Sequence, residues 1–582
     1  MKKQLSFSGK LWKFREKKIE SLEELQESIL ADLNLANSDE IQKFMTPSLN
    51  DLRDPFDLKN MDIAISRTIQ AIKNKERIMI VGDFDADGIT STVILVSALK
   101  NCGAEVSYFI PDRTNDSHGL QKRFMEKFAE KRVKLVITCD CATNDAEEIS
   151  YGKSLGIETI VTDHHQMDHT RFPKEAVAVV NCQSSENFVE KSLSGSAVAL
   201  KFATALLNTF FEQSPAKISE YLDPLFEIAT IGIISDCVKL IGDNRIIAKY
   251  GLAKMSQTKW DGLKLLLERL KIKEVNEENV GFFIAPHLNA ASRLGDVMIA
   301  VQLFLGNPAK NSERVEYLIN LNRERRVQTD ILIKSAEKQI EAKAFCQFFF
   351  AENWPQGIMG LVASHFAEKL NVPIIVSTIR QTDGMLSASC RAPEGYSIID
   401  GLENSAKFLT SFGGHAGAAG FIAEKKNLEK IRGNLNKYFT QEQKNSSEIK
   451  AEAFVNPKVL SLDLVEFLKF LAPFGEGNPP RIFALEKVKI TDIFLMGKDG
   501  NHAKFTGTIY SSPDLAQNKN NPKSELENKL NKQEIQFVAF FAENFLEKIK
   551  IGDEIDILVS VSENEWQGRV SLQLKLIDAR KG

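Results

Sequence analysis

Three aspartates on alternate positions follow an apolar run and form a dense group of side chains that could do chemistry. The string is Val81-Gly82-Asp83-Phe84-Asp85-Ala86-Asp87-Gly88, directly after Ile78-Met79-Ile80. Like charges this close repel one another unless a multivalent cation neutralises them, and hard oxygen ligands suit Mg²⁺ or Mn²⁺. A turn is the alternative interpretation, because Asp and Gly also favour turns. Taken alone, the string leaves both interpretations open.

Three later segments also place an acidic group, or an acidic group with two imidazoles, after an apolar stretch. They end in Asp140, in Asp163-His164-His165 and in Asp236. We interpret these positions as the carboxyl ends of strands, which gather at one edge of an open parallel sheet, where ligands bind. Four such ends predict one metal site, and this favours metal over a simple turn at the three aspartates.

The elements that must position these groups can be traced along the chain. Residues from about 51 to 260 alternate short apolar strands with helical stretches, the pattern of a parallel sheet with crossover helices. A charge-rich segment without Gly or Pro, residues 311–343, predicts a long helix that joins two lobes. A second α/β pattern follows, and the tail from about residue 451 has the short alternating runs of an all-β domain. The strands that we expect in the first lobe are 78–81, 106–110, 135–138, 159–161 and 177–180.

Composition narrows the class of protein. No stretch approaches the roughly 18 apolar residues that cross a bilayer, and seven cysteines without framework spacing argue against a disulfide scaffold. We therefore expect a cytoplasmic protein. Cys139 and Cys141, two positions apart on a strand, should point to one face; we expect buried thiols rather than a metal pair. The net charge of -4 means that any nucleic-acid binding uses local basic patches.

Several strings together carry a family resemblance. Asp163-His164-His165, preceded by the three aspartates and followed by Asp236, resembles the DHH phosphoesterase superfamily, and Ser411-Phe412-Gly413-Gly414-His415-Ala416-Gly417-Ala418-Ala419-Gly420 resembles its associated DHHA1 domain. Further matches are Leu193-Ser194-Gly195, Asn289-Ala290-Ala291-Ser292-Arg293-Leu294-Gly295 and Pro473-Phe474-Gly475-Glu476-Gly477-Asn478-Pro479. In this order they are similar to the bacterial RecJ family of single-strand-specific exonucleases, over nearly the whole chain.

The resemblance implies an α/β fold with two α/β lobes, DHH and DHHA1, joined by a long helix, plus a C-terminal β-rich OB-fold domain. The domains that we expect are an N-terminal appendage (1–50), a DHH phosphoesterase domain (51–260), a helical connector (261–343), a DHHA1 domain (344–440) and a nucleic-acid-binding OB-fold (451–582). A polar insertion begins near residue 516 within this tail.

The implied function is a metal-dependent 5′-to-3′ exonuclease that hydrolyses single-stranded DNA to 5′-mononucleotides in recombination and repair. Two Mn²⁺ or Mg²⁺ ions are the implied cofactors, since paired ions can activate water and stabilise both oxygens of a displacement. The implied metal ligands are Asp85, Asp87, Asp140, His164 and Asp236, with Asp83 either coordinating or orienting. His165 approaches the scissile phosphate by resemblance; a second metal ligand or a structural hydrogen bond is the alternative.

Substrate recognition is implied at a second set of positions. Arg113, Arg293, Ser389 and Arg391 match family positions that hold the 5′-terminal phosphate, and arginine suits that task through its bidentate fork. Asn289 belongs to the same set, together with Gly413, Gly414 and His415, whose bare backbone would let a phosphate approach; a turn that merely permits tight packing is the alternative. His287, Ser292 and Cys390 depart from the usual pattern and affect the fine geometry of this pocket.

The resemblance also implies partners, namely single-stranded DNA with a 5′ end, a single-strand-binding protein and a helicase, with no membrane contact and a monomeric state. Two other functions compete. One is a phosphodiesterase of short oligonucleotides or cyclic dinucleotides, which the β-rich tail disfavours, and the other is an inactive DNA-binding scaffold, which the intact acidic and histidine set disfavours.

Overall fold

The computed structural model describes residues 5–582 except 16–17, 34, 36, 114–115, 117, 186–187, 189, 441–447, 498–499, 512–530, 541 and 567. It divides into two compact units, each described below by itself. One consists of residues 48–443 with 473–478, and the other of residues 1–47, 444–472 and 479–582.

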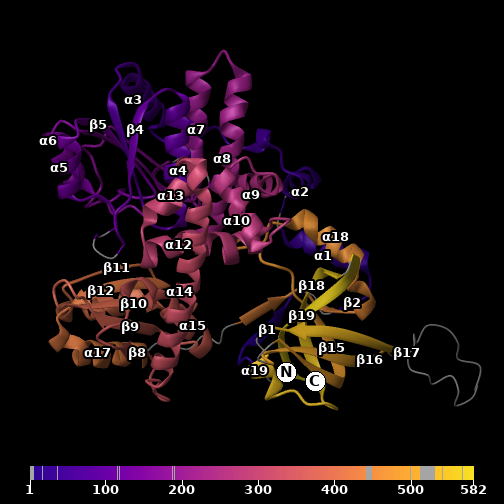
Figure 1. Ribbon diagram of the computed structural model, residues 1–582. Coiled ribbons are helices and arrows are strands. Elements are labelled where there is room, and N and C mark those ends of the chain that lie inside the picture. Colours follow the sequence, from indigo (N-terminus) through magenta and orange to yellow (C-terminus); the bar gives the residue numbers. More distant parts are fainter. Residues whose placement is uncertain are drawn as a thin grey trace, which may run out of the picture. The chain divides into compact units, whose positions relative to one another are not determined.

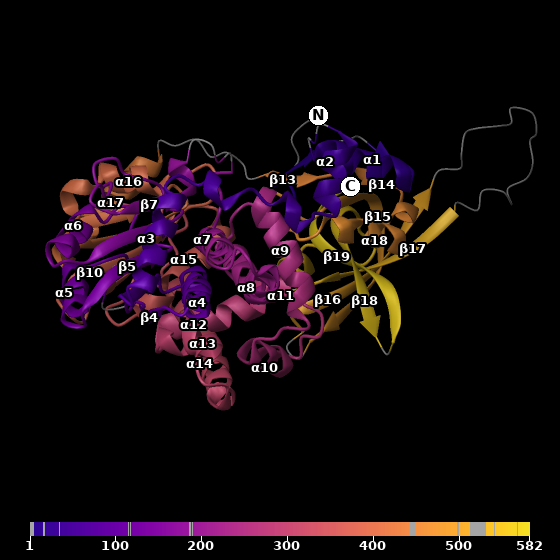
Figure 2. The same cartoon turned by 90° about the horizontal axis from the view of Figure 1, so that it is seen from above.

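The larger unit begins with a five-stranded, wholly parallel sheet in the order β4-β3-β5-β6-β7. Its strands are β3 (Arg77–Gly82), β4 (Glu105–Phe109), β5 (Val133–Cys139), β6 (Glu158–Asp163) and β7 (Ala178–Asn181). Helices α3 (Met61–Lys73), α4 (Ala86–Asn101) and α7 (Gly195–Phe210) cover one face, and α5 (Lys122–Glu130) and α6 (Ala146–Ser154) cover the other (Figure 2). Because both faces are covered, the inner strands are largely apolar and buried, and all five strands that we predicted are confirmed.

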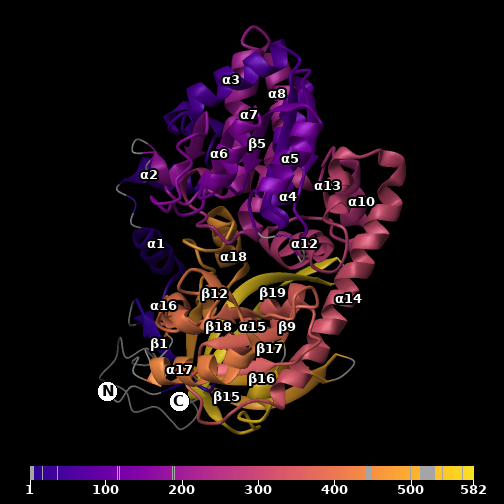
Figure 3. The same ribbon diagram turned by 90° about the vertical axis from the view of Figure 1, so that its left-hand side faces the viewer.

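A helical segment links this sheet to a second one within the same unit. It contains α8 (Pro215–Ser235), α9 (Gly242–Met255), α10 (Asp261–Leu270), α12 (Ala285–Leu294), α13 (Val297–Leu305) and α14 (Asn311–Glu337). Helix α14 runs from beside α10 and α13 to the second lobe, as Figure 3 shows, and there it contacts α15 (Gln356–Leu370). The predicted connecting helix is thus confirmed.

The second lobe is built on a mixed sheet in the order β11-β12-β10-β9-β8. Its strands are β8 (Gln347–Phe350), β9 (Ile374–Ile379), β10 (Leu386–Arg391), β11 (Ser411–Gly414) and β12 (Ala418–Ala423), with α16 (Ile398–Asn404) and α17 (Leu428–Thr440) packed on it. Strand β11 lies on the side of this lobe that faces the first sheet (Figure 1).

The smaller unit is a closed barrel. Strands β15 (Phe483–Met496), β16 (His502–Ser511), β17 (Asn531–Ala539), β19 (Arg569–Lys581) and β18 (Glu554–Trp566) pair in a ring, because β16 also pairs with β15. The N-terminal strands join this unit: β1 (Leu11–Phe14) pairs with β13 (Glu448–Ala451), and β2 (Lys18–Ile19) pairs with β14 (Phe454–Val455). We expected residues 1–50 as an appendage; residues 1–47 share a unit with the barrel, and the five-domain division stays a prediction.

Two local expectations were wrong. Asp236 does not follow a strand; it is the C-cap of the buried helix α8. A buried apolar run cannot distinguish strand from helix by periodicity. Cys139 and Cys141 are both free and buried, as predicted, but they pack in cores on opposite faces of the sheet. The strand ends between them because Asp140 has a φ of 62°, which breaks the alternation.

Two expectations concern the C-terminal tail and the membrane. Most of the polar insertion near residues 516–533 and the side chain of Trp566 lie outside the described residues. Among the helices of the described chain, none combines the length and the apolar character that crossing a bilayer requires.

Candidate metal centre and phosphate site

The loop between β3 and α4 presents the first two aspartates. Asp85 is the N-cap of α4, and its Oδ1 accepts hydrogen bonds from the backbone N–H groups of Asp87 (3.0 Å) and Gly88 (3.1 Å). A Cβ at Gly88 would lie 2.4 Å from the carbonyl oxygen of Asp83, so only glycine allows this tight turn. The Asn289 side chain accepts a hydrogen bond from the Ala86 N–H (2.9 Å), which fixes the same helix start.

Asp87 connects two helices. It lies in the first turn of α4, and its carboxylate accepts hydrogen bonds from the N–H groups of Gly195 (2.7 Å) and Ser196 (3.0 Å) at the start of α7. A carboxylate at a helix N-terminus is stabilised by the unpaired N–H groups there. This contact gives the Leu193-Ser194-Gly195 string a role that the sequence alone did not reveal.

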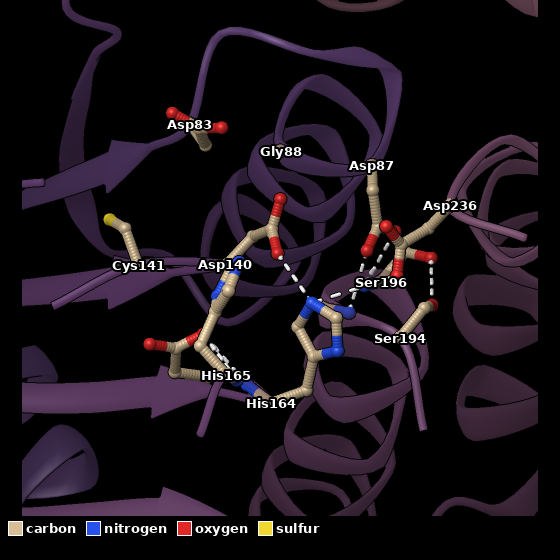
Figure 4. Close-up of polar contacts among 12 residues, drawn as sticks. Asp83, Asp87, Gly88, Asp140, Cys141, His164, His165, Ser194, Ser196 and Asp236 are labelled. Atoms are coloured by element: carbon tan, nitrogen blue, oxygen red, sulfur yellow. Dashed lines mark hydrogen bonds and ion pairs between the residues drawn. The ribbon is translucent and has the colours of Figure 1, made fainter. Parts of the chain in front are cut away.

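Figure 4 shows Asp140 on one side of the His164 ring and Asp87 and Asp236 together on the other side. The His164 Nε2 atom is 3.1 Å from Asp140 Oδ1 and 3.6 Å from Asp236 Oδ2. Asp140 can lie there because residue 195 is glycine: a Cβ at Gly195 would be 2.5 Å from both the Cβ and the Oδ1 of Asp140.

The side chains form two groups that could each hold a cation, with ligand atoms within 4.8 Å of one another: Asp87, His164 and Asp236, and Asp83, Asp85 and Asp140. Asp140 also contacts His164, so it lies where the two groups meet. A third such group adds Asp163 and His165 to Asp140 and His164. Its Asp163 is already occupied by hydrogen bonds from the N–H groups of Thr143, His164 and His165.

The electrostatics of the site fit divalent cations. Burial, together with the neighbouring carboxylates, raises the pKa of Asp236 to about 9 and that of Asp85 to about 6. Burial and the same neighbours raise the pKa of Asp140 well above its ordinary value, and its Oδ1 is a buried oxygen without a hydrogen-bond donor among the described residues. Burial lowers the pKa of His164, which leaves a neutral imidazole able to donate its lone pair. Buried oxygens that repel one another beside a neutral imidazole are a ligand set that Mn²⁺ or Mg²⁺ would neutralise.

His165 faces a different direction from His164. Its Nδ1 donates to Asp163 Oδ1 (2.8 Å), which fixes the ring and leaves Nε2 available. Burial works to lower the pKa of His165, but the hydrogen bond and charge of Asp163 outweigh it and raise the pKa. Asp163 therefore positions this imidazole at the edge of the site and favours its protonated form.

His118 is a member of the site that sequence reasoning missed. Its Nδ1 lies 3.0 Å from Asp83 Oδ1, and its ring centre lies 5.2 Å from that of His165. Although burial opposes it, the Asp83 carboxylate raises the pKa of His118 to about 9. A lone histidine in a loop gives no periodic signal, and only its nearness to Arg113 in the sequence could have pointed to it.

Beside the carboxylates lies a cluster of arginines. Arg113 stacks over the Phe84 ring (4.7 Å to the centroid), and its Nη1 is buried without an acceptor among the described residues. Arg293 donates to the Gly357 carbonyl (2.7 Å) at the start of α15, and burial, then the charges of Arg113, Arg325 and Arg391, lower its pKa to about 9. Like charges held together in this way repel one another, and a bound anion would relieve that repulsion.

Arg391 and Ser389 reach the same helix start from β10. A Cβ at Gly360 would be 3.2 Å from Arg391 Nη2 and 4.0 Å from Ser389 Oγ, so the glycine admits both side chains beside the first turns of α15. Helix N-termini favour anions. Cys390 points away from them into the core of the second lobe, and this departure therefore leaves the pocket intact. Ser292 is buried and donates to the Asn289 carbonyl (3.1 Å) within α12.

The glycine-rich hairpin β11–β12 supplies backbone and one imidazole. A Cβ at Gly413 would meet nothing within 4 Å, so its backbone lies open, whereas Gly414 has a φ of 141° and a Cβ there would clash with the Ala418 carbonyl at 2.4 Å. His415 lines a cavity of about 800 Å³ together with His164, His165 and Asp236. The second lobe thus contributes to the cavity beside the acidic groups.

Comparisons with known proteins agree with this geometry. The DHH family N-terminal domain matches residues 77–233, the DHHA1 domain residues 341–441, and the RecJ OB domain residues 451–513 and 509–578. The single-stranded-DNA-specific exonuclease RecJ of Bacillus subtilis is 30% identical over 95% of this chain and 67% of its own length. The protein of the same name from Haemophilus influenzae is 29% identical over 81% of this chain and 84% of its own length.

Solved structures of RecJ proteins are also similar to this chain. The crystal structure of RecJ in complex with Mn²⁺ from Thermus thermophilus matches with a TM-score of 0.78 at 25% identity and covers 98% of this chain and 80% of its own. The corresponding Mg²⁺ complex matches with a TM-score of 0.74.

Proposed function

Since the chain belongs to the RecJ family of single-stranded-DNA-specific exonucleases, we propose that this metal-dependent exonuclease degrades single-stranded DNA from the 5′ end and releases 5′-mononucleotides. The observation that supports degradation from the 5′ end is the arginine cluster that adjoins the acidic groups. Asp85 belongs to one candidate ligand group, and its charge acts on both Arg113 and Arg293. An anion pocket next to a cleavage site fits a strand whose end is held while the neighbouring linkage is cut.

The proposed roles follow from the contacts. Asp87, His164 and Asp236 would hold one ion and Asp83, Asp85 and Asp140 the other, with Asp140 between them. Bound ions of this kind polarise water and neutralise the charge of phosphoryl oxygens. His165 would donate a proton to the leaving oxygen from Nε2, because its Nδ1 is held by Asp163. Arg113, Arg293 and Arg391 would bind the terminal phosphate with Ser389 and the N–H groups of α15, and the open backbone of Gly413 would lie along the strand.

The kind of DNA that the enzyme cuts also suggests the process and the partners with which it acts. An exonuclease for single strands acts on DNA that has been unwound, so we propose that it works in recombination and repair with a helicase and a single-strand-binding protein. The seven cysteines are all unpaired, which fits the reducing conditions of the cytoplasm. A monomer would suffice, since both lobes of the site come from one chain.

Direction can be tested with one strand labelled at either end. Cleavage from the 5′ end predicts that a 5′-terminal label appears at once as a mononucleotide, while a 3′-terminal label stays in a shortening strand. A circular single strand should resist. Early release of the 3′ label would contradict the proposed polarity, and turnover of dinucleotides without shortening of long strands would favour the short-substrate phosphodiesterase instead.

The phosphate pocket is tested by Arg391→Ala. Losing a charged hydrogen bond of about 1.5–3 kcal/mol should lower kcat/KM about tenfold or more on 5′-phosphorylated strands. Strands with a 5′-hydroxyl should be affected far less. Arg380→Ala, which removes an arginine paired with Asp383 in the same lobe, is the matched control and should leave the ratio of the two substrates unchanged. Equal losses on both substrates for Arg391→Ala would show that Arg391 supports structure or internal phosphates.

A further inference from the structure

The helix that carries Asn289 and Arg293 contains a widened turn. Residues 280–284 form a π-helical segment that continues directly into α12, and the Ala285 N–H bonds to the Val280 carbonyl. Pro286 explains the widening, since proline has no N–H to donate and its ring clashes with the carbonyl four residues earlier. Widened turns of this kind are frequent at functional sites.

His287 closes this turn with its side chain. Its Nδ1 is 2.5 Å from the Phe283 carbonyl oxygen, and its Nε2 is 3.1 Å from the Asn322 side-chain nitrogen on α14. A carbonyl can only accept, so Nδ1 carries the proton, and Nε2 accepts from the Asn322 amide when the ring is neutral. Burial, and then the charges of Arg326 and Arg325, lower the pKa of His287, which supports the neutral ring.

Asn322 in turn holds the side chain of Arg325. Both His287 and Asn322 are buried, at 5% and 2% exposure, so their geometry is fixed by packing. With its amide nitrogen bound to His287, Asn322 turns its Oδ1 to the Nε of Arg325 (3.0 Å). A guanidinium held at Nε has a defined plane, and the two terminal nitrogens of Arg325 meet no acceptor among the described residues. They are left for a ligand.

Arg325 lies on α14, which packs against α12, the helix that carries Arg293. Its charge acts on Arg293, as those of Arg113 and Arg391 do. The arginine cluster therefore includes Arg325.

We propose that Arg325 is a specificity-determining residue for the 5′ end, which binds an oxygen of a terminal phosphate monoester, and that Asn322 and His287 are its positioning residues. A terminal monoester has one more unesterified oxygen and more charge than an internal diester, about -1.5 to -2 at neutral pH. An additional arginine beside Arg293 matches that difference. This inference rests on the proposed function and names how the same pocket recognises a chain end.

The test compares 5′-phosphorylated and 5′-hydroxyl strands of one sequence in the full-length protein. Arg325→Ala should lower the ratio of kcat/KM for the two substrates about tenfold, the size of one charged hydrogen bond. Arg323→Ala is the matched control, because Arg323 lies on the same helix, is exposed and, among the described residues, bonds only Asn320 (2.9 Å). It should leave the ratio unchanged. Arg325→Lys, which keeps the charge and cannot bond Asn322 through an Nε–H in the same way, should lose part of the preference.

Positioning is tested by a double-mutant cycle and by binding without metal. Asn322→Ala should lower the ratio as Arg325→Ala does, and the double variant should be no worse than Arg325→Ala alone. In EDTA, Arg325→Ala should weaken the binding of a fluorescent 5′-phosphorylated trinucleotide but not of its 5′-hydroxyl counterpart. Thermal melts establish that each variant is folded.

Three results would overturn the inference. Equal losses on both substrates for Arg325→Ala, or none, would remove its role at the terminal phosphate. Additive effects of Asn322→Ala and Arg325→Ala would remove the positioning role of Asn322. A wild-type enzyme without any preference for a 5′-phosphate would remove the proposed end recognition itself, and the role of Arg325 with it.

Discussion

At the scale of single residues, the acidic groups are held together at a cost to the metal-free protein. Asp140 and Asp236 are kept within 3.1 and 3.6 Å of one imidazole nitrogen, and burial raises the pKa of both carboxyls. A carboxyl whose pKa is higher in the folded than in the unfolded chain resists ionisation in the fold. Its ionisation at higher pH therefore weakens folding unless a cation compensates.

Asp236→Asn tests this balance. For the wild-type chain in EDTA, the contribution of Asp236 to stability should fall as pH rises from its ordinary pKa of 3.8 to about 9. The variant should lose that dependence, melt higher than wild type in EDTA at about pH 9, and lose about a hundredfold or more in activity, the scale of one lost electrostatic contact in an active site. Thermal melts at several pH values, with and without Mn²⁺, measure it. Near-normal Mn²⁺-dependent turnover would contradict the ligand assignment.

The structure brings together the metal ligands that we expected from the sequence, but the sequence did not reveal the side chains that hold them in place. Asp83, Asp85, Asp87, Asp140 and His164 come together because they follow the carboxyl ends of parallel strands, which converge at one edge. Asp236 joins them from the C-cap of helix α8. Asp163 holds His165 through a hydrogen bond within the triplet itself. His118 binds Asp83 from a segment 35 residues away, and no local pattern encodes such a contact, so it became visible only in the fold.

At the scale of elements, the site depends on how closely α7 and α8 approach α4. A Cβ at Gly232 of α8 would lie 2.3 Å from Asp87 Oδ1, and Gly195 of α7 makes room for Asp140. Periodicity correctly predicted the sheet and the connecting helix α14. It misassigned the run before Asp236, because a helix buried on all sides is as uniformly apolar as a buried strand.

Gly195→Ala is predicted to displace Asp140 without unfolding the protein. Its Cβ would stand 2.5 Å from the Cβ of Asp140, so the carboxylate must shift by an amount that costs metal affinity and at least tenfold in activity, by analogy with about 10–100-fold for altered metal-site supports. Gly433→Ala, in an exposed part of α17 with nothing within 4 Å, is the control and should stabilise the protein by about 1 kcal/mol. Mn²⁺ titration followed by calorimetry measures the affinity. Unchanged Mn²⁺ affinity in Gly195→Ala would show that Asp140 tolerates displacement.

At the scale of the whole molecule, segments from the two ends of the chain pair within one unit, which the sequence did not predict. The N-terminal strands pair with β13 and β14, so residues 1–47 belong with the barrel rather than with the sheet that follows them. Segment 473–478 belongs instead to the larger unit, where the Leu240 N–H donates to the Glu476 carbonyl (2.7 Å). Pairing between remote short strands leaves little trace in local composition, and a cut near Lys450 would therefore disrupt both units.

The barrel carries an exposed aromatic and basic surface suited to single strands. Phe494 lies opposite Lys504 in the pairing of β15 with β16, and His502, two residues earlier on β16, packs against Phe540 (5.5 Å between ring centres). Phe494 and Phe540 are 64% and 50% exposed, whereas Phe505 faces inward and stacks on Phe537 in the core. Base stacking on exposed aromatic rings contributes about 1–3 kcal/mol per base, and it involves no ion release.

Point variants on this surface can separate the binding of DNA from its cleavage in the intact chain. Replacing Phe494 and Phe540 together by Ala should weaken the binding of long single strands about tenfold or more, from the stacking energy lost, and leave the salt dependence of binding unchanged. Lys504→Ala should instead lower the salt slope by about 1, because a phosphate contact releases a counterion. Cleavage of a trinucleotide should stay at the wild-type rate in all of them, since the metal centre belongs to the other unit. Ile551→Ala, which removes an exposed apolar side chain elsewhere in the same unit, is the control. Unchanged affinity for long strands in the double variant would assign this face of the barrel to protein partners rather than to DNA.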